Sequence, residues 1–114
     1  MIEQILIKQI KADLPNLPIY HDFAPPKAKP PLLVLSRVGG AGHRFLEREG
    51  AYEVRVQISV WATERVQAVQ LSRQIEQSLF RLPELSSNGA AVAVHDVDTD
   101  WRGMRQDFLI FEQS

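Results

Sequence analysis

The 114-residue sequence contains no cysteine, which excludes disulfides, zinc–thiolate sites and thiol nucleophiles. It also lacks an excess of either charge, since 13 Lys and Arg residues balance 14 Asp and Glu residues. A protein that coats a phosphate backbone usually carries a clear excess of cations, so we expect no general nucleic-acid binding. No apolar run approaches the ~20 residues that cross a bilayer. The amphipathic N-terminus, with Glu3 in its first turn, does not have the pattern of a signal or transit peptide. We therefore expect a protein made and folded in a cytosol, with no membrane partner.

The clearest pattern in the sequence is an alternation of apolar and polar residues from Tyr52 to Ala62, which Trp61 interrupts only at its end. It predicts a strand over 51–62 with one face on a core. Apolar residues at steps of three and four follow, and they predict a helix over 63–82 with Thr63 as its N-cap. Pro83 then ends this helix.

The remaining segments are shorter, and the chain length and the hydrophobic content of 45% are those of one globular domain, 1–114. An apolar stripe predicts a first helix over 2–14, ended by prolines. Runs of apolar residues between turn formers predict four more strands, over 19–23, 32–38, 91–97 and 104–112. This order favours an α+β fold, with a mainly antiparallel sheet of four to five strands and two helices packed on one face.

Three carboxylates, Asp96, Asp98 and Asp100, stand at alternate positions. On a strand they would point to one face, and in a loop they would imitate the opening of an EF-hand. The EF-hand interpretation fails because Trp101 occupies the position that needs glycine, and Asp107 the position of the bidentate glutamate. We therefore expect no metal site here, but a solvated acidic strand edge, whose like charges discourage pairing with another edge.

The glycines at positions 39, 40 and 42 do not form a phosphate-binding loop, because His43 stands where such a loop needs lysine. No dinucleotide-binding glycine pattern is present either, so we expect no cofactor. Glycines instead flank the segment 39–50, which predicts a long mobile loop.

Each of the three histidines has an acidic residue nearby in the sequence: His21 has Asp22, His43 has Glu47 and His95 has Asp96. Such a pair can act as a general base. No serine of the chain stands in a nucleophile elbow, however, and three histidines are ordinary for this length. The sequence thus indicates no catalytic residue, and we expect a protein that is not an enzyme.

The cations are mostly arginine, nine against four lysines, and arginine is favoured at interfaces. A solvated surface with weak ion pairs is an equally good explanation for any single residue. In the loop 39–50, however, these cations stand beside carboxylates and an aromatic ring. We expect this loop to be a contact arm, and its candidate interface residues are Arg44, Phe45, Glu47, Arg48 and Glu49.

Over almost its whole length the chain resembles the small tail-completion, or tail terminator, proteins of long-tailed bacteriophages and prophages. The resemblance is carried by the proline-rich approach to PPLLVLSRV, the glycine-containing loop, the segment YEVRVQISVWAT that runs into a long helix, and the final RQDFLIF. The most specific part is the segment 54–62 with the helix that follows it. The resemblance is one of pattern and length, because none of these residues is catalytic.

The resemblance implies a structural role in the virion tail, for a protein synthesised in the cytoplasm of a bacterial host. Such proteins form a ring, typically a hexamer, that caps the tail tube, ends its growth and offers a surface to the neck of the head. The implied partners are other copies of the chain, the tail tube protein and the head–neck connector proteins, while DNA only passes through. Carboxylates repel phosphate, so Asp96, Asp98 and Asp100 are candidates for lining the channel.

Three other functions remain open from the sequence. A head-completion or connector protein of the same phage neck would share the small α+β build. A small-ligand enzyme or regulatory domain would use His21 or His95. A nucleic-acid binder is disfavoured by the balanced charge.

Overall fold

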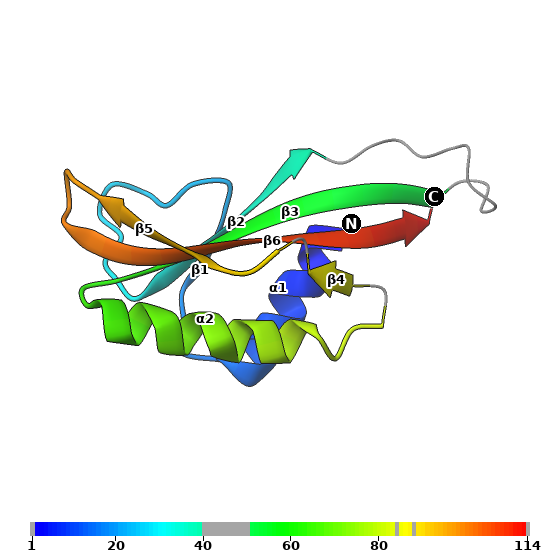
Figure 1. Cartoon of the computed structure of the whole chain (residues 1–114), viewed down its shortest axis with the longest axis horizontal. Helices are drawn as coiled ribbons and strands as arrows, with labels where there is room; N and C mark the ends of the chain where they lie inside the picture. Colours follow the sequence, from blue (N-terminus) through cyan, green and yellow to red (C-terminus); the bar gives the residue numbers. More distant parts are fainter. Residues whose placement is uncertain (1, 40–50, 84, 88, 114) are drawn as a thin grey trace.

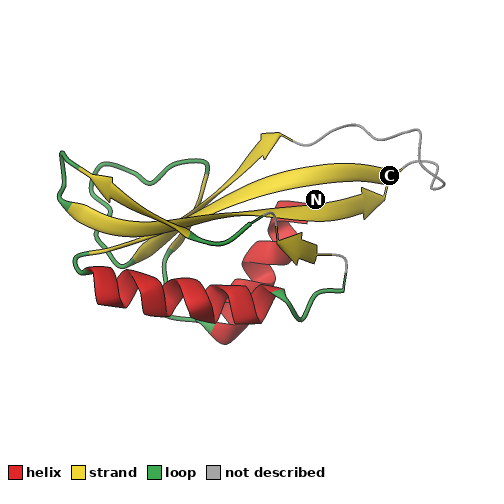
Figure 2. Ribbon diagram, viewed as in Figure 1, coloured by secondary structure: helices red, strands yellow, loops and turns green. Residues whose placement is uncertain are grey.

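The computed structural model describes residues 2–39, 51–83, 85–87 and 89–113. In these residues two helices lie on one side of a six-stranded sheet, as Figure 1 and Figure 2 show. The helices are α1 (Ile2–Asp13) and α2 (Arg65–Leu79). The strands are β1 (Ile19–His21), β2 (Leu32–Gly39), β3 (Ala51–Ala62), β4 (Leu85–Ser87), β5 (Val92–Asp96) and β6 (Trp101–Gln113). The predicted α+β class is confirmed, with one strand more than the four to five expected.

The strand order is β1-β2-β3-β6-β4, and β5 pairs with β6 on the same side as β4. Only β1 and β2 are parallel, so the sheet is mainly antiparallel as predicted. The long strands β3 and β6 form its centre, and they pair from Ala51 opposite Gln113 to Ala62 opposite Arg102. The sheet therefore has β1 at one edge and the two short strands β4 and β5 at the other.

The alternation in β3 separates the two faces of the sheet. Val54, Val56, Ile58 and Val60 are at most 4% exposed, and they face the helices together with their cross-strand partners. Phe108 lies opposite Val56 and is 1% exposed. Three apolar residues of α1 (Ile2, Leu6 and Ile10) and three of α2 (Ala68, Ile75 and Leu79) complete the buried layer.

The two helices contact each other through a polar cluster as well as through the core. Ser78 in α2 is fully buried, and its hydroxyl donates to the carboxylate of Asp13 in α1. Gln9 Nε2 donates to the carbonyl oxygen of Ser78 at 3.0 Å, and Arg81 pairs with Asp13 at 2.9 Å. Because its hydroxyl and its carbonyl oxygen both have hydrogen-bond partners, the buried serine is accommodated between the helices.

The predicted helix over 63–82 is too long at both ends. Its N-cap is Glu64, not Thr63, and the Glu64 side chain makes no capping hydrogen bond. At the other end the amides of Arg81 and Leu82 bond to carbonyls three residues back, so the chain tightens into turns after Leu79.

The edge strands also differ from the prediction. The strand expected at 19–23 ends at His21, because Asp22 has a φ of 76° and leaves the extended conformation. The strand expected at 104–112 begins at Trp101, since the first three residues of β6 already pair with β3 and β5. The strand β4 was not predicted. Neither helix of the described residues is long and apolar enough to cross a membrane.

Candidate functional site

The five interface candidates Arg44, Phe45, Glu47, Arg48 and Glu49 lie outside the described residues, as does nearly all of the predicted loop 39–50. The structure does place the two ends of this segment. β2 ends at Gly39 and β3 begins at Ala51, and these strands are antiparallel neighbours in the sheet. Ala51 lies opposite Gln113 of β6, so the segment leaves from the end of the sheet that also holds the C-terminus.

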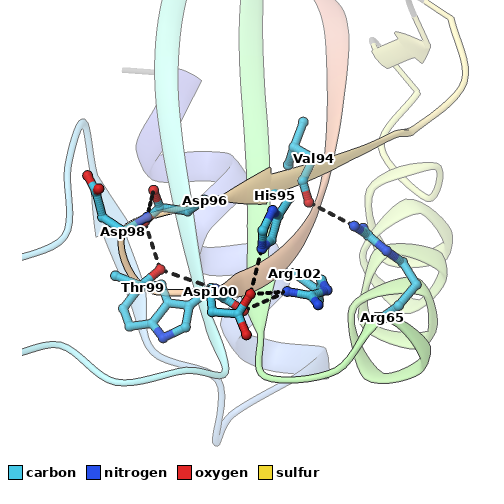
Figure 3. Close-up of polar contacts among 9 residues, drawn as sticks. Arg65, Val94, His95, Asp96, Asp98, Thr99, Asp100 and Arg102 are labelled. Atoms are coloured by element: carbon cyan, nitrogen blue, oxygen red, sulfur yellow. Dashed lines mark hydrogen bonds and ion pairs between the residues drawn. The ribbon is translucent and has the colours of Figure 1, made fainter.

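The three aspartates Asp96, Asp98 and Asp100 lie at the opposite end of the sheet, in the connection between β5 and β6 (Figure 3). The expectation of a solvated acidic strand edge was wrong, because only Asp96 lies on a strand. The amide of Asp100 bonds to the carbonyl of Asp96 at 2.8 Å and closes a tight turn. Asp100 has a φ of 63°, a left-handed conformation that aspartate tolerates better than most residues.

The side chain of Asp96 holds this turn together. Its carboxylate accepts the hydroxyl of Thr99 at 2.7 Å and the amide of Asp98 at 3.4 Å. The Thr99 hydroxyl in turn accepts the amide of Trp101 at 3.2 Å. Local bonds from Asp and Thr side chains are typical of turns, and they explain why Asp96 and Thr99 occur here.

The carboxylate of Asp100 faces an arginine and a histidine from the adjoining strands (Figure 3). Arg102 Nη1 lies 2.7 Å and His95 Nε2 lies 2.8 Å from Asp100 Oδ1. The hydrogen bonds from Arg102 and His95 lower the pKa of Asp100 below its ordinary value. His95 therefore pairs with Asp100 and not with its sequence neighbour Asp96. All three side chains are exposed, so their ion pairs contribute little to stability.

Arg65, the first residue of α2, fastens this hairpin to the helix layer. Its guanidinium donates to the carbonyl oxygens of Gly103 in β6 and of Val94 in β5, the latter at 2.9 Å. Val94 and Gly103 are directly opposite each other, so one side chain holds both strands. The planar fork of arginine suits two such acceptors better than the point charge of lysine does.

A second polar cluster joins α1 to the strand β2. Glu3 is 4% exposed, and Arg37 of β2 binds both of its carboxylate oxygens, at 2.7 and 3.1 Å. His21 Nε2 lies 3.8 Å from Glu3 and 3.9 Å from Asp22. The charge of Arg37 pairs with this carboxylate, so the cluster is an ion pair that fixes the start of α1 on the sheet. The third histidine, His43, lies outside the described residues.

The described residues bring no three metal-ligating side chains together. Two open depressions of about 330 and 350 Å³ lie beside the α1–β1 connection. The first depression is lined mainly by residues 13–17 and the second mainly by residues 15–20. Neither is lined by His21, by His95 or by the aspartates of the β5–β6 turn. The two histidine–carboxylate contacts of the described chain, at His21 and His95, thus lie outside these depressions.

A comparison with protein families covers nearly the whole chain. Residues 7–112 match the family described as tail completion protein gp17. The chain belongs to this family, whose members are phage tail-completion proteins. A comparison with curated proteins gave no match.

The contacts of Arg65 and Glu3 were not predicted from the sequence. Arg65 binds backbone carbonyls, and every residue offers such carbonyls, so no residue type marks the partner in advance. The partner of Glu3 is 34 residues away on a different element. A carboxylate on the apolar face of the first helix was a signal that could have indicated a buried ion pair.

Proposed function

We propose that this protein caps the phage tail tube as a ring of identical copies, typically six, which ends tube growth and presents a surface to the neck of the head. The observation that carries the proposal is the match of residues 7–112 to the tail-completion family. On this proposal the protein resides in the virion tail. Its partners are its own copies, the tail tube protein and the head–neck connector proteins, and DNA only passes through the ring.

We assign a different contact to each end of the sheet. At one end the segment 40–50 joins the neighbouring strands β2 and β3, and its sequence contains an aromatic residue and a mixture of arginine and glutamate. Mixed charge around an aromatic anchor is typical of specific protein interfaces. We propose that Phe45 and Arg48 in this segment contact a neighbouring copy or the tail tube, with Arg44, Glu47 and Glu49 beside them.

The other end carries the acidic turn between β5 and β6, which we propose faces the channel. Asp96 and Asp100 already bind partners within the hairpin, whereas the side chain of Asp98 is exposed at its tip. A rigid turn that presents a carboxylate repels the phosphates of passing DNA and so keeps the channel from retaining it. The balanced charge of the chain is compatible with such a lining.

The genetic test is removal of the gene from the virus that encodes it. The proposal predicts tails of irregular length that do not join to heads, and restoration of normal tails when the protein is supplied in trans. Tails of normal length with empty or unstable heads would instead indicate a head-completion protein.

A further inference from the structure

The strand β5 has few contacts that fix its position. None of its five residues is buried, so β5 contributes no side chain to the core. Among the described strands it pairs only with β6, and the pairing of β6 with β3 ends where Arg102 lies opposite Ala62. The β5–β6 hairpin therefore continues past the end of β3 as a two-stranded ribbon (Figure 1). Such a ribbon is only marginally ordered by its own pairing, so another contact has to fix its direction.

One side chain of the helix layer provides this contact. Arg65 Nη2 donates to the carbonyl oxygen of Val94 in β5 at 2.9 Å, as Figure 3 shows. Nη1 donates to the carbonyl oxygen of Gly103 in β6 and lies 3.6 Å from Sδ of Met104. Among the described residues of the two helices, Arg65 alone makes a hydrogen bond to β5. The direction of the hairpin relative to α2 therefore depends on this one guanidinium.

Arg65 is at the same time unfavourable for the helix that it begins. It is the first residue of α2, where the helix dipole favours a carboxylate, and the first turn contains no acidic residue. The N-cap residue Glu64 makes no side-chain capping bond that would offset this. A residue that breaks a local rule usually has a compensating role elsewhere in the fold. The bonds of Arg65 to the hairpin explain its presence better than the helix does.

We propose that Arg65 sets the direction in which the β5–β6 hairpin projects, and thereby positions the carboxylate of Asp98 at its tip. The bonds of Asp96 to Thr99 and to the amide of Asp100 close the turn, so the tip moves together with the two strands. Asp98 is exposed and bonds to this turn through its amide, so its location follows that of the hairpin. Arg65 acts through the hairpin and is a positioning residue. Only the consequence for the channel rests on the proposed function.

The first test is amide hydrogen exchange of the purified protein, for the wild type, Arg65→Ala and Arg65→Lys. We expect the amides of β5 and of the turn 96–100 to exchange about tenfold faster in Arg65→Ala, since bonds from a charged donor are lost. The amides in the middle of β3 should keep their rates. Arg65→Lys should restore part of the protection, because lysine can bind one carbonyl but lacks the fork of arginine.

The matched control is Arg73→Ala, which removes an exposed arginine from the same helix and should leave the exchange of β5 unchanged. If Arg65→Ala does not fold, Arg65→Lys is compared with Arg73→Lys in the same way. An equal acceleration in β3 and β5 would indicate a general loss of stability, and unchanged exchange in β5 would indicate no effect on the hairpin. Either result would overturn the proposal.

The second test measures the position of the tip. The chain has no cysteine, so Val97→Cys and Gln74→Cys together place one spin label on the turn and one on α2. Val97 is 80% exposed and Gln74 is exposed, so both sites accept a label. Pulsed electron spin resonance should give a narrow distribution of distances with Arg65, and a broader or displaced distribution with Arg65→Ala. Identical distributions would contradict a positioning role.

The consequence for the tail is measured by complementation of a gene-deleted virus. We expect Arg65→Ala to lower infectivity per assembled particle, and to have no such effect in an Asp98→Asn background, where the displaced carboxylate is absent. An equal loss in both backgrounds would overturn the link between Arg65 and Asp98. A hairpin that loosens as expected, with infectivity unchanged, would count against the proposed channel role of the turn and would leave the positioning role of Arg65 supported by the first two tests.

Discussion

The indole ring of Trp61 lies directly against Gly103 on the neighbouring strand. The two residues are opposite each other in β3 and β6, and a Cβ atom at position 103 would stand 2.7 Å from Cε3 of Trp61. It would also stand 2.9 Å from the carbonyl oxygen of Val60. Position 103 therefore requires glycine because of a close approach. The tryptophan that interrupts the polar face of β3 covers the space that this glycine leaves.

We predict that Gly103→Ala lowers the free energy of unfolding by about 1–3 kcal/mol, because the added methyl group overpacks this contact. Urea denaturation of the purified variant measures the loss. In a Trp61→Ala background the same substitution should cost less, since the ring no longer obstructs the methyl group, although the carbonyl of Val60 still does. Equal losses in the two backgrounds would show that Trp61 is not the cause.

A second prediction concerns the buried carboxylate of Glu3. Glu3→Gln keeps the size of the side chain but removes the charge that Arg37 binds, so it should cost about 1–2 kcal/mol at neutral pH. The estimate is below that for a fully buried pair, because the Arg37 side chain is 40% exposed. Glu64→Gln is the matched control, an exposed glutamate whose side chain makes no capping bond, and it should change stability little.

The cost of Glu3→Gln should also depend on pH. Burial raises the pKa of Glu3, but the hydrogen bonds and charge of Arg37, with that of His21, outweigh it, so the pKa is lowered overall. The unfolded chain then binds more protons than the folded one, and the stabilisation by Glu3 is fully present above the ordinary pKa of about 4.3. It is lost as pH falls through the lowered pKa of the folded state. Denaturation at a series of pH values from 7 downward should show the two proteins converging, and a constant difference would contradict this.

The segment between β2 and β3 is tested by deletion of residues 44–49. We expect the variant to fold, because the flanking strands β2 and β3 pair with each other up to Gly39 and Arg55, and to fail in tail completion, because it lacks the proposed contact residues. An equal-length replacement by glycine and serine should fail as well. Circular dichroism checks folding and complementation of a gene-deleted virus checks function. Normal tails from either variant would exclude a contact role for this segment.

The acidic turn is tested by Asp98→Lys, which changes the charge at the tip of the hairpin. The variant should be as stable as the wild type, since Asp98 contributes only its amide to the turn. It should still complete tails but deliver DNA less efficiently, because a cation in the channel attracts phosphate. Glu64→Lys, the same charge change at the start of α2, is the control. The measurement is infectivity relative to the number of assembled particles. Equal values for the two variants would show that the turn does not face the channel.

The fold class could be predicted from the sequence because the long elements have a period that repeats. Eleven residues of alternation in β3 and the apolar positions at steps of three and four in α2 determine which faces meet in the core. The short elements carry no such repetition. The strand β4 has three residues, Leu85, Ser86 and Ser87, and its pairing with β6 depends on the position of its neighbours, not on its own pattern.

The polar clusters, like the short strands, could not be predicted from a local pattern. The spacing of Asp96, Asp98 and Asp100 looked like that of a strand face, and the structure shows a turn, because the side chain of Asp96 bonds to the backbone that follows it. Residues of this type favour turns for that reason. The bond between Glu3 and Arg37 depends on the placement of α1 against the end of β2, which no local pattern encodes.

The proposed role is tested most directly by electron microscopy of purified tail tubes mixed with the purified protein. We expect an additional ring of density at one end of each tube, and no further elongation of capped tubes when tail tube protein is added. Density along the walls, binding to isolated heads in place of tubes, or tubes that continue to grow at the occupied end would contradict it.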